Sequence, residues 1–253
     1  MRILLIHFIL FSLFSGSKAA TYIAADVSEF NTLKQRLLPG DTLLLANGNW
    51  KDAEILIENK GSVAAPVYIG AETQGKVLFT GNSKIKIGGE HIIVSGFLFT
   101  DGFSANGPVI EFRAAAGKPA NHCRVTNMAI INYNNPDRLK EDHWVALFGR
   151  GNRFDHNQLS YKKNSGATLV VELNDTLNQM NYHLIDHNYF GERIRLGSNG
   201  GETIRIGTST FSKTSSGTIV EENYFYRCSG EVEIISVKSC DNILRRNTFF
   251  ECE

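Results

Sequence analysis

The nine residues "LIDHNYFGE" (184–192) recur in altered form along the second half of the chain. The related stretches are "RVTNMAI" (124–130), "RFDHNQLSY" (153–161), "IVEENYFYR" (219–227) and "ILRRNTFFE" (243–251). Each contains an asparagine that is followed two residues later by an apolar residue, which is phenylalanine in the last three units. The units return at irregular intervals of about 24 to 35 residues, which is typical of a solenoid built from strands.

The repeated asparagine predicts how successive units stack. In a parallel β-helix each unit forms one coil, and equivalent residues lie about 4.8 Å apart. Stacked asparagine amides can satisfy one another at a corner, and the phenylalanines two residues later can stack in the core. A second β-rich run follows most units, as in "WVALFG" (144–149) and "ETIRIGT" (202–208). We therefore predict an all-β fold, a right-handed parallel β-helix, with a ladder formed by Asn127, Asn157, Asn188, Asn223 and Asn247.

The N-terminal stretch has the features of an export signal. "MRILLIHFILFSLFSGSKAA" (1–20) joins one arginine to a short apolar run and ends in small residues at a spacing that signal peptidase accepts. The run is too short for a mature membrane span. We predict a cleaved signal peptide over residues 1–20 and a secreted or periplasmic protein, with the β-helix domain over 21–253.

Both ends of the predicted solenoid have to be covered. "DVSEFNTLKQRLLPGD" (26–41) predicts one amphipathic helix over 28–38, with Ser28 as N-cap, and such a helix would cap the first coil. At the other end the chain stops at Glu253, directly after a strand. We expect that C-terminal coils are missing and that the complete form is a monomer.

Composition restricts the partners. Lys plus Arg and Asp plus Glu both number 26, so no net basic field favours nucleic acid or a membrane surface. The four cysteines have no metal-site spacing, and we predict free buried thiols. Cys228 and Cys252 both lie five residues after a ladder asparagine and should stack in the core.

One stretch carries charges in an otherwise strand-forming sequence. In "SGEVEIISVKS" (229–239), Glu231 and Glu233 would share one face of a regular strand, whereas Lys238 would point to the other. A solvated strand face followed by a surface lysine is the simplest interpretation of these residues alone. The spacing also allows two strands with a corner between Glu233 and Lys238, which would let all three side chains reach one groove.

The stretches "RIRLGSNGGETIRIG" (193–207) and "VEENYFYRCSGEVEIISVKSCDNILRRNTFFEC" (220–252) resemble polysaccharide lyases of family 6. That family includes alginate lyases and the dermatan-cleaving chondroitin B lyases, and the resemblance begins near Thr21. It implies a calcium ion held by Asn199, Glu231 and Glu233, and Lys238 as the catalytic base. It also implies an arginine acid, which is expected beyond Glu253, so the chain alone is expected to be inactive.

The implied set is chemically coherent. Adjacent carboxylates repel unless a cation lies between them, and an oxygen-only donor set suits calcium. A cation bound to a uronate carboxylate would stabilise the charge that develops when the C5 proton is removed. A nearby cation would also disfavour the protonated form of a lysine and make it a usable base.

Arginines flank the implied calcium ligands. Arg193, Arg195 and Arg205 are either ordinary exposed charge or clamps for the carboxylates of neighbouring sugars, and we assign Arg195 and Arg205 to the acidic polysaccharide substrate. Two further pairs, His143 with Trp144 and Lys162 with Lys163, are interpreted mainly as structural.

Three functional hypotheses remain open. The first is a calcium-dependent lyase of a uronic acid polymer, with alginate preferred and dermatan sulfate as the alternative. The second is a carbohydrate-binding β-helix without chemistry, which would not need a base beside a metal. The third is a pectate-lyase-like enzyme, although such enzymes use aspartate-rich calcium sites.

Overall fold

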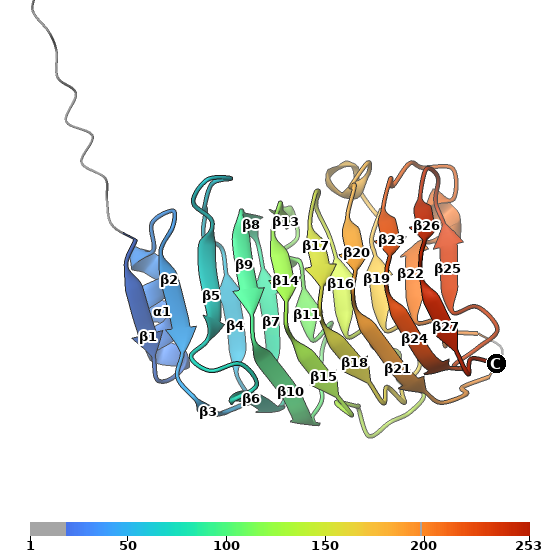
Figure 1. The fold of residues 1–253 in the computed structure, drawn as a ribbon, viewed down its shortest axis with the longest axis horizontal. Helices are drawn as coiled ribbons and strands as arrows, with labels where there is room; N and C mark the ends of the chain where they lie inside the picture. The colour runs from blue at the N-terminus through green and yellow to red at the C-terminus, as the bar shows by residue number, and fades with distance from the viewer. Residues whose placement is uncertain (1–18, 198) are drawn as a thin grey trace, which may run out of the picture.

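Three parallel β-sheets run along the molecule and enclose one apolar core (Figure 1). The computed structural model describes residues 19–197 and 199–253. The predicted signal peptide lies almost wholly outside the described residues. None of the described helices has the length and apolar character needed to cross a bilayer.

Each coil from β2 to β25 contributes one strand to each sheet in turn, while β1, β26 and β27 extend the first two sheets. The first sheet contains β1 (Thr21–Ala24), β2 (Thr42–Leu45), β5 (Val67–Ala71), β9 (Ile92–Ser95), β14 (Arg124–Thr126), β17 (Arg153–Asp155), β20 (Leu184–Asp186), β23 (Ile219–Glu221) and β26 (Ile243–Arg245). The second contains β3 (Gly48–Lys51), β6 (Val77–Gly81), β10 (Phe97–Gly102), β15 (Ala129–Ile131), β18 (Gln158–Ser160), β21 (Tyr189–Arg193), β24 (Tyr224–Cys228) and β27 (Thr248–Phe250). The third contains β4 (Glu54–Ile57), β7 (Lys84–Ile87), β11 (Ile110–Glu111), β16 (Val145–Leu147), β19 (Leu169–Val171), β22 (Ile204–Gly207) and β25 (Ile235–Lys238). The prediction of an all-β parallel β-helix is confirmed.

Short elements decorate the coils. A small three-stranded sheet is formed by β8 (Gly89–Glu90), β12 (Arg113–Ala115) and β13 (Lys118–Asn121). Three 3₁₀ turns cover Lys34–Arg36, Thr176–Asn178 and Ser209–Phe211.

The predicted asparagine ladder exists for four of its five members. The Nδ2 group of Asn157 donates to Oδ1 of Asn188 at 3.0 Å, and Asn188 repeats this contact with Asn223 at 3.0 Å. Asn223 donates in turn to Asn247 at 3.1 Å. Each of these acceptor oxygens also takes the backbone N–H of the preceding asparagine. The ladder therefore satisfies buried polar groups on consecutive coils, as predicted.

Asn127 was wrongly assigned to this ladder. It is exposed, and Met128 occupies the ladder position, with its backbone N–H donating to Oδ1 of Asn157 at 2.9 Å. Asn127 has a φ of 54°, which makes it equivalent to His156 and His187, both at 55°. Asparagine tolerates this left-handed conformation, so it can occupy the left-handed position of the coil as well as the ladder position. The coil repeat is one residue shorter here than the sequence comparison assumed.

The predicted aromatic stack is confirmed. The rings of Phe190 and Phe225 lie 5.1 Å apart at 10°, and those of Phe225 and Phe249 lie 4.8 Å apart at 10°. All four cysteines are free, as predicted, but only Cys123 and Cys228 are buried. Cys252 is half-buried and stacks on Cys228, whose N–H approaches its Sγ at 3.4 Å, whereas Cys240 is exposed, against the prediction. Cys240 lies in a turn after β25, outside the repeated core positions.

The N-terminal helical cap is present but shorter than predicted. Helix α1 (Val27–Leu33) packs on β1 and β2 (Figure 1). Its Phe30 is fully buried in the apolar core. Its N-cap is Asp26, not Ser28, because the extended Asp26 accepts the N–H of Glu29 at 2.8 Å. A 3₁₀ turn replaces the last part of the predicted helix, and Leu37 is already extended.

One buried histidine predicts the pH dependence of stability. His183 is fully buried, and its Nδ1 accepts the N–H of Asn152 at 3.2 Å. Burial lowers the pKa of His183 to about 3. Because the unfolded histidine titrates near 6.5, the unfolded state binds a proton first as the pH falls, and stability is lost below that pH. Between pH 7.5 and pH 5 the loss from this residue should be about 2 kcal/mol.

Urea unfolding at the two pH values measures this effect. His183→Gln should lose about 2 kcal/mol less than the wild type on acidification. The exposed His122 is the matched control, because its replacement by asparagine should preserve the wild-type loss. An equal acid loss for the wild type and His183→Gln would contradict the assignment.

Candidate functional site

The predicted site residues lie on two adjacent coils. Asn199 lies between β21 and β22, while Glu231 and Glu233 lie between β24 and β25, and Lys238 ends β25. Because β21 pairs with β24 and β22 pairs with β25, the two connections are neighbours. The structure thus brings the segments that carry the three implied ligands side by side.

Direct contacts hold these two segments together. The N–H of Gly201 donates to Oε2 of Glu231 at 2.9 Å, and the N–H of Leu196 donates to the carbonyl of Gly230 at 2.9 Å. A Cβ atom on Gly201 would lie 2.4 Å from the carbonyl oxygen of Gly230, and one on Gly230 would lie 2.2 Å from that of Gly201. Glycine is therefore required at both positions for the backbones to approach this closely.

Residues 229–234 do not form the regular strand that was expected. The strand begins only at Ile235, and the preceding residues bend around the close contact at Gly230. Val232, which in a regular strand would lie on the face opposite the two glutamates, is 84% exposed. Glu231 is buried and Glu233 is exposed, so the two carboxylates differ in environment instead of sharing a strand face.

Lys238 and Arg205 lie on one outer face of the third sheet. Ile204 and Ile206 of β22 are fully buried in the core, so Arg205 and Gly207 face outward. Arg205 is in register with Ser236, and Gly207 with Lys238. Strand spacing places the Cα atoms of Arg205 and Lys238 about 8 Å apart. This face can therefore present a base and a carboxylate clamp to one ligand.

The three flanking arginines have different environments. Arg205 is half-buried, and its Nη1 lies 4.0 Å from Oε1 of Glu141. Arg195 is exposed, and its carbonyl oxygen accepts from Arg138. Arg193 is turned into the molecule and is 3% exposed, so it cannot be a clamp at the surface.

Two groups on this face were missed from the sequence. Glu172 follows β19, and the strand register continues through Gly207 to Lys238, so all three occupy one outward row. Burial raises the pKa of Glu172, although Arg205 and Arg113 oppose this effect. Aligning "TLVVELN" (168–174), "ETIRIGT" and "EVEIISVK" (231–238) by strand register would have found it.

The other missed group, Glu141, belongs to a loop beside Arg205. The same loop carries His143, whose Nδ1–H donates to the carbonyl of Ala167 at 2.9 Å while Nε2 lies 3.7 Å from Glu141. Burial lowers the pKa of His143. The imidazole is thus held at the edge of the face with a fixed orientation.

The contacts of Trp144 and Lys162 fit the mainly structural role that the sequence suggested for them. Trp144 is fully buried and donates its indole N–H to the carbonyl of Tyr133 at 2.9 Å. Lys162 is also buried, where it pairs with Asp142 and donates to the carbonyl of Asn164 at 3.2 Å.

The donor set at the two connections is compatible with a hard cation. Among residues 19–197 and 199–253, no group of three or more His, Cys, Asp or Glu side chains is arranged to hold a metal. The implied set needs only two carboxylates and one amide. Oε2 of Glu231 accepts the N–H of Gly201, so Oε1 is the oxygen that this carboxylate can offer to a cation. An oxygen-only set of this kind suits calcium, with water and ligand oxygens completing the shell.

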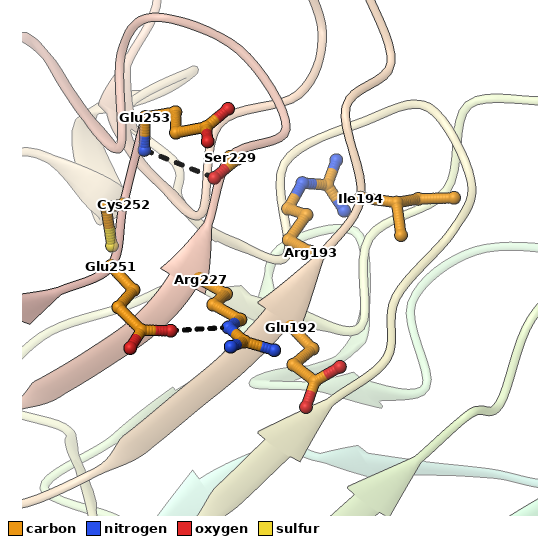
Figure 2. A pocket seen from close by; sticks show the side chains of 8 residues that line it. All are labelled: Glu192, Arg193, Ile194, Arg227, Ser229, Glu251, Cys252 and Glu253. Carbon is orange, nitrogen blue, oxygen red and sulfur yellow. Dashed lines mark hydrogen bonds and ion pairs between the residues drawn. The ribbon is translucent and has the colours of Figure 1, made fainter.

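A hollow opens beside these connections at the last coil (Figure 2). Across it, Arg227 pairs with Glu251 at 2.7 Å, and the N–H of Glu253 donates to Oγ of Ser229 at 3.2 Å. Its lining comprises Glu192, Arg193, Ile194, Arg227, Ser229, Glu251, Cys252 and Glu253. None of the implied ligands lines it, and neither does Lys238, so this hollow does not coincide with the predicted site.

Comparison with known proteins finds relatives with the same fold. The family model of chondroitinase B matches residues 24–253. The solved family 6 alginate lyase AlyGC is 49% identical, with a TM-score of 0.91 over 92% of this chain and 32% of its own. A mannuronic acid specific family 6 lyase from human gut microbiota is 40% identical, with a TM-score of 0.86 over 92% of this chain and 55% of its own.

A third solved structure is a family 6 alginate lyase in complex with a trisaccharide. It is 25% identical, with a TM-score of 0.75 over 94% of this chain and 51% of its own. The chain therefore spans between about a third and about half of the length of these solved relatives. No curated protein sequence matched the chain.

Proposed function

Because this chain belongs to polysaccharide lyase family 6, the family of chondroitinase B, we propose that it acts as a lyase that cleaves a uronic acid polymer by β-elimination. One observation carries the proposal. Lys238 and Arg205 share an outer face directly beside the coupled connections that carry Asn199 and Glu231.

Lys238 is proposed as the base. Its neutral amine takes the C5 proton of a uronate, the C4–O4 bond breaks, and a C4=C5 double bond forms as O4 leaves and gains a proton. Lys238 is half-buried at the outer end of β25, where its backbone is fixed by pairing with Gly207. This anchoring gives the amine a restricted range of positions over a ligand on the sheet.

Arg205 and Arg195 are proposed to hold substrate carboxylates. Arg205 lies in the row next to Lys238, and its only ion pair within 4.0 Å in the described part of the chain is the one with Glu141 at 4.0 Å. A guanidinium so weakly engaged is available for a bidentate contact with a uronate. Arg195 is exposed in the same connection as Asn199 and would hold a neighbouring sugar.

Calcium is proposed as the cofactor, held by Asn199, Glu231 and Glu233. When bound, it would neutralise the uronate carboxylate and so favour loss of the C5 proton. The contact between Gly201 and Glu231 couples the two connections that supply these ligands. Substrate and water would complete the coordination shell.

Alginate is proposed as the substrate. The solved relatives at 49% and 40% identity are described as an alginate lyase and as a mannuronic acid specific lyase. Dermatan sulfate is the second candidate, since the matching family model is that of chondroitinase B. An exported enzyme would meet either polymer outside the cytoplasm.

The test is an absorbance assay for the unsaturated product. We expect the full-length protein that contains this chain to produce it from alginate, to lose the activity with a chelator, and to regain it with calcium. Faster product formation from dermatan sulfate would reassign the substrate. Binding of alginate without product would favour the carbohydrate-binding hypothesis over the enzyme.

A further inference from the structure

Arg193, the last residue of β21, makes an unusual set of buried hydrogen bonds. Its Nε donates to the carbonyl of Gly201 at 2.6 Å. Its Nη2 donates to the carbonyls of Gly166 at 2.7 Å, Gly200 at 3.3 Å and Asn164 at 3.3 Å. One guanidinium thus contacts four backbone carbonyls and no carboxylate oxygen among the described contacts.

These carbonyls belong to two successive coils. Asn164 and Gly166 precede β19, while Gly200 and Gly201 directly follow Asn199. Gly201 then donates its N–H to Glu231 on the next coil. Arg193 is therefore the centre of a connection across three coils that contains an implied calcium ligand on each of the last two.

The two coils after Arg193 have no guanidinium at this corner. Arg193 is in register with Cys228, and Cys252 stacks on Cys228 in the coil after that. A small apolar side chain closes the corner in both later coils. In the preceding coil the register places Lys162 at this position, also buried and also donating to the carbonyl of Asn164. Among the described contacts of these two cations, only those of Arg193 reach Gly200 and Gly201 beside Asn199.

Keeping this charge buried is costly. Burial lowers the pKa of Arg193 to about 10, and its Nη1 has no hydrogen-bond partner in the described structure. A well-packed apolar residue commonly stabilises a fold as well as a buried charge does. A planar fork of donors, however, fixes several carbonyls in one geometry, which an apolar side chain cannot do.

We propose that Arg193 is a positioning residue that holds Gly200 and Gly201 so that Asn199 and Glu231 are preorganised for the cation and the substrate carboxylate. The inference rests on the proposed function and deepens it. Residues that orient metal ligands typically change metal affinity by about 10- to 100-fold when they are replaced. Arg193 should therefore influence cation affinity although it is buried and is not itself a cation ligand.

The test uses the full-length protein with Arg193→Met and Arg193→Lys. Calcium is titrated calorimetrically in the presence of an alginate trisaccharide, in a Lys238→Ala background that prevents cleavage. Arg193→Met should weaken calcium binding by about 10- to 100-fold. Arg193→Lys, which keeps the charge but lacks the planar fork, should recover only part of the loss, and it decides the question if the methionine variant does not fold.

Arg124→Met is the matched control. Arg124 is a partly buried arginine whose two side-chain hydrogen bonds go to Asp155 on the first sheet. Its loss should lower the thermal midpoint while calcium affinity stays within about 2-fold of that of the parent, because Arg124 contacts no part of the connections. The Lys238→Ala background does not cleave alginate, so kcat and KM are measured in the protein that retains Lys238. There, Arg193→Lys should mainly lower kcat.

Two outcomes would separate the failure of this inference from that of the proposed function. If the parent binds no calcium and forms no product, the proposed function fails and the inference fails with it. If the parent binds calcium and cleaves alginate while a folded Arg193 variant does both equally well, only the positioning role is overturned.

Discussion

Lys238→Ala should lower the turnover of alginate by about 10²- to 10⁴-fold, the usual contribution of a general base. The side chain projects from the outer face of β25, while the inward neighbours that support the core remain in place. Its removal should therefore leave the fold intact. Steady-state rates of product formation, together with the circular dichroism spectrum and thermal midpoint, measure both expectations.

Two companion variants make this result specific. Lys238→Arg keeps a positive charge for substrate binding but cannot give up its proton at neutral pH, so it should be as inactive as the alanine variant. Lys213→Ala removes an exposed lysine from the turn after β22 and should retain the parent rate. Substantial activity in Lys238→Arg would show that Lys238 acts through its charge and that the base is another group.

Asn188→Leu should lower the free energy of unfolding by about 3 to 5 kcal/mol. Its Oδ1 accepts from both the N–H and Nδ2 of Asn157 at 3.0 Å, and its Nδ2 donates to the carbonyl of Phe154 at 2.8 Å and to Asn223 at 3.0 Å. Leucine has a similar size but leaves these buried groups without partners. Each unsatisfied buried group costs about 1 to 3 kcal/mol.

Denaturant unfolding measures this loss, and Asn127 provides the control. Asn127 is exposed and has a φ of 54°, so Asn127→Gly should change stability by less than about 0.5 kcal/mol. The two asparagines are alike in the repeated sequence and differ only in their place on the coil. A loss of stability for Asn127→Gly as large as that for Asn188→Leu would mean that the ladder does not carry the expected hydrogen-bond energy.

The solenoid and much of its interior follow from the sequence by itself. Each coil contacts only its neighbours, so residues that recur once per coil must meet, as Phe190 and Phe225 do and as Asn188 and Asn223 do. The outward position of Lys238 also follows from strand alternation once Ile204 and Ile206 are recognised as core residues. In these regions the periodic pattern along the chain is enough to predict which residues of neighbouring coils are in contact.

Only the tertiary structure decided what happens at the corners. There Asn127 takes the left-handed position that His156 takes in the next coil, and Met128 takes the ladder position of Asn157, so the two asparagines share a residue type but not a position. The close approach of Gly201 and Gly230 bends the chain before Ile235, which leaves Glu231 buried against Gly201 and Glu233 exposed. Arg193 is turned inward by carbonyls of two coils. Such directions depend on contacts between residues about one coil apart, and no periodicity within a single strand encodes them.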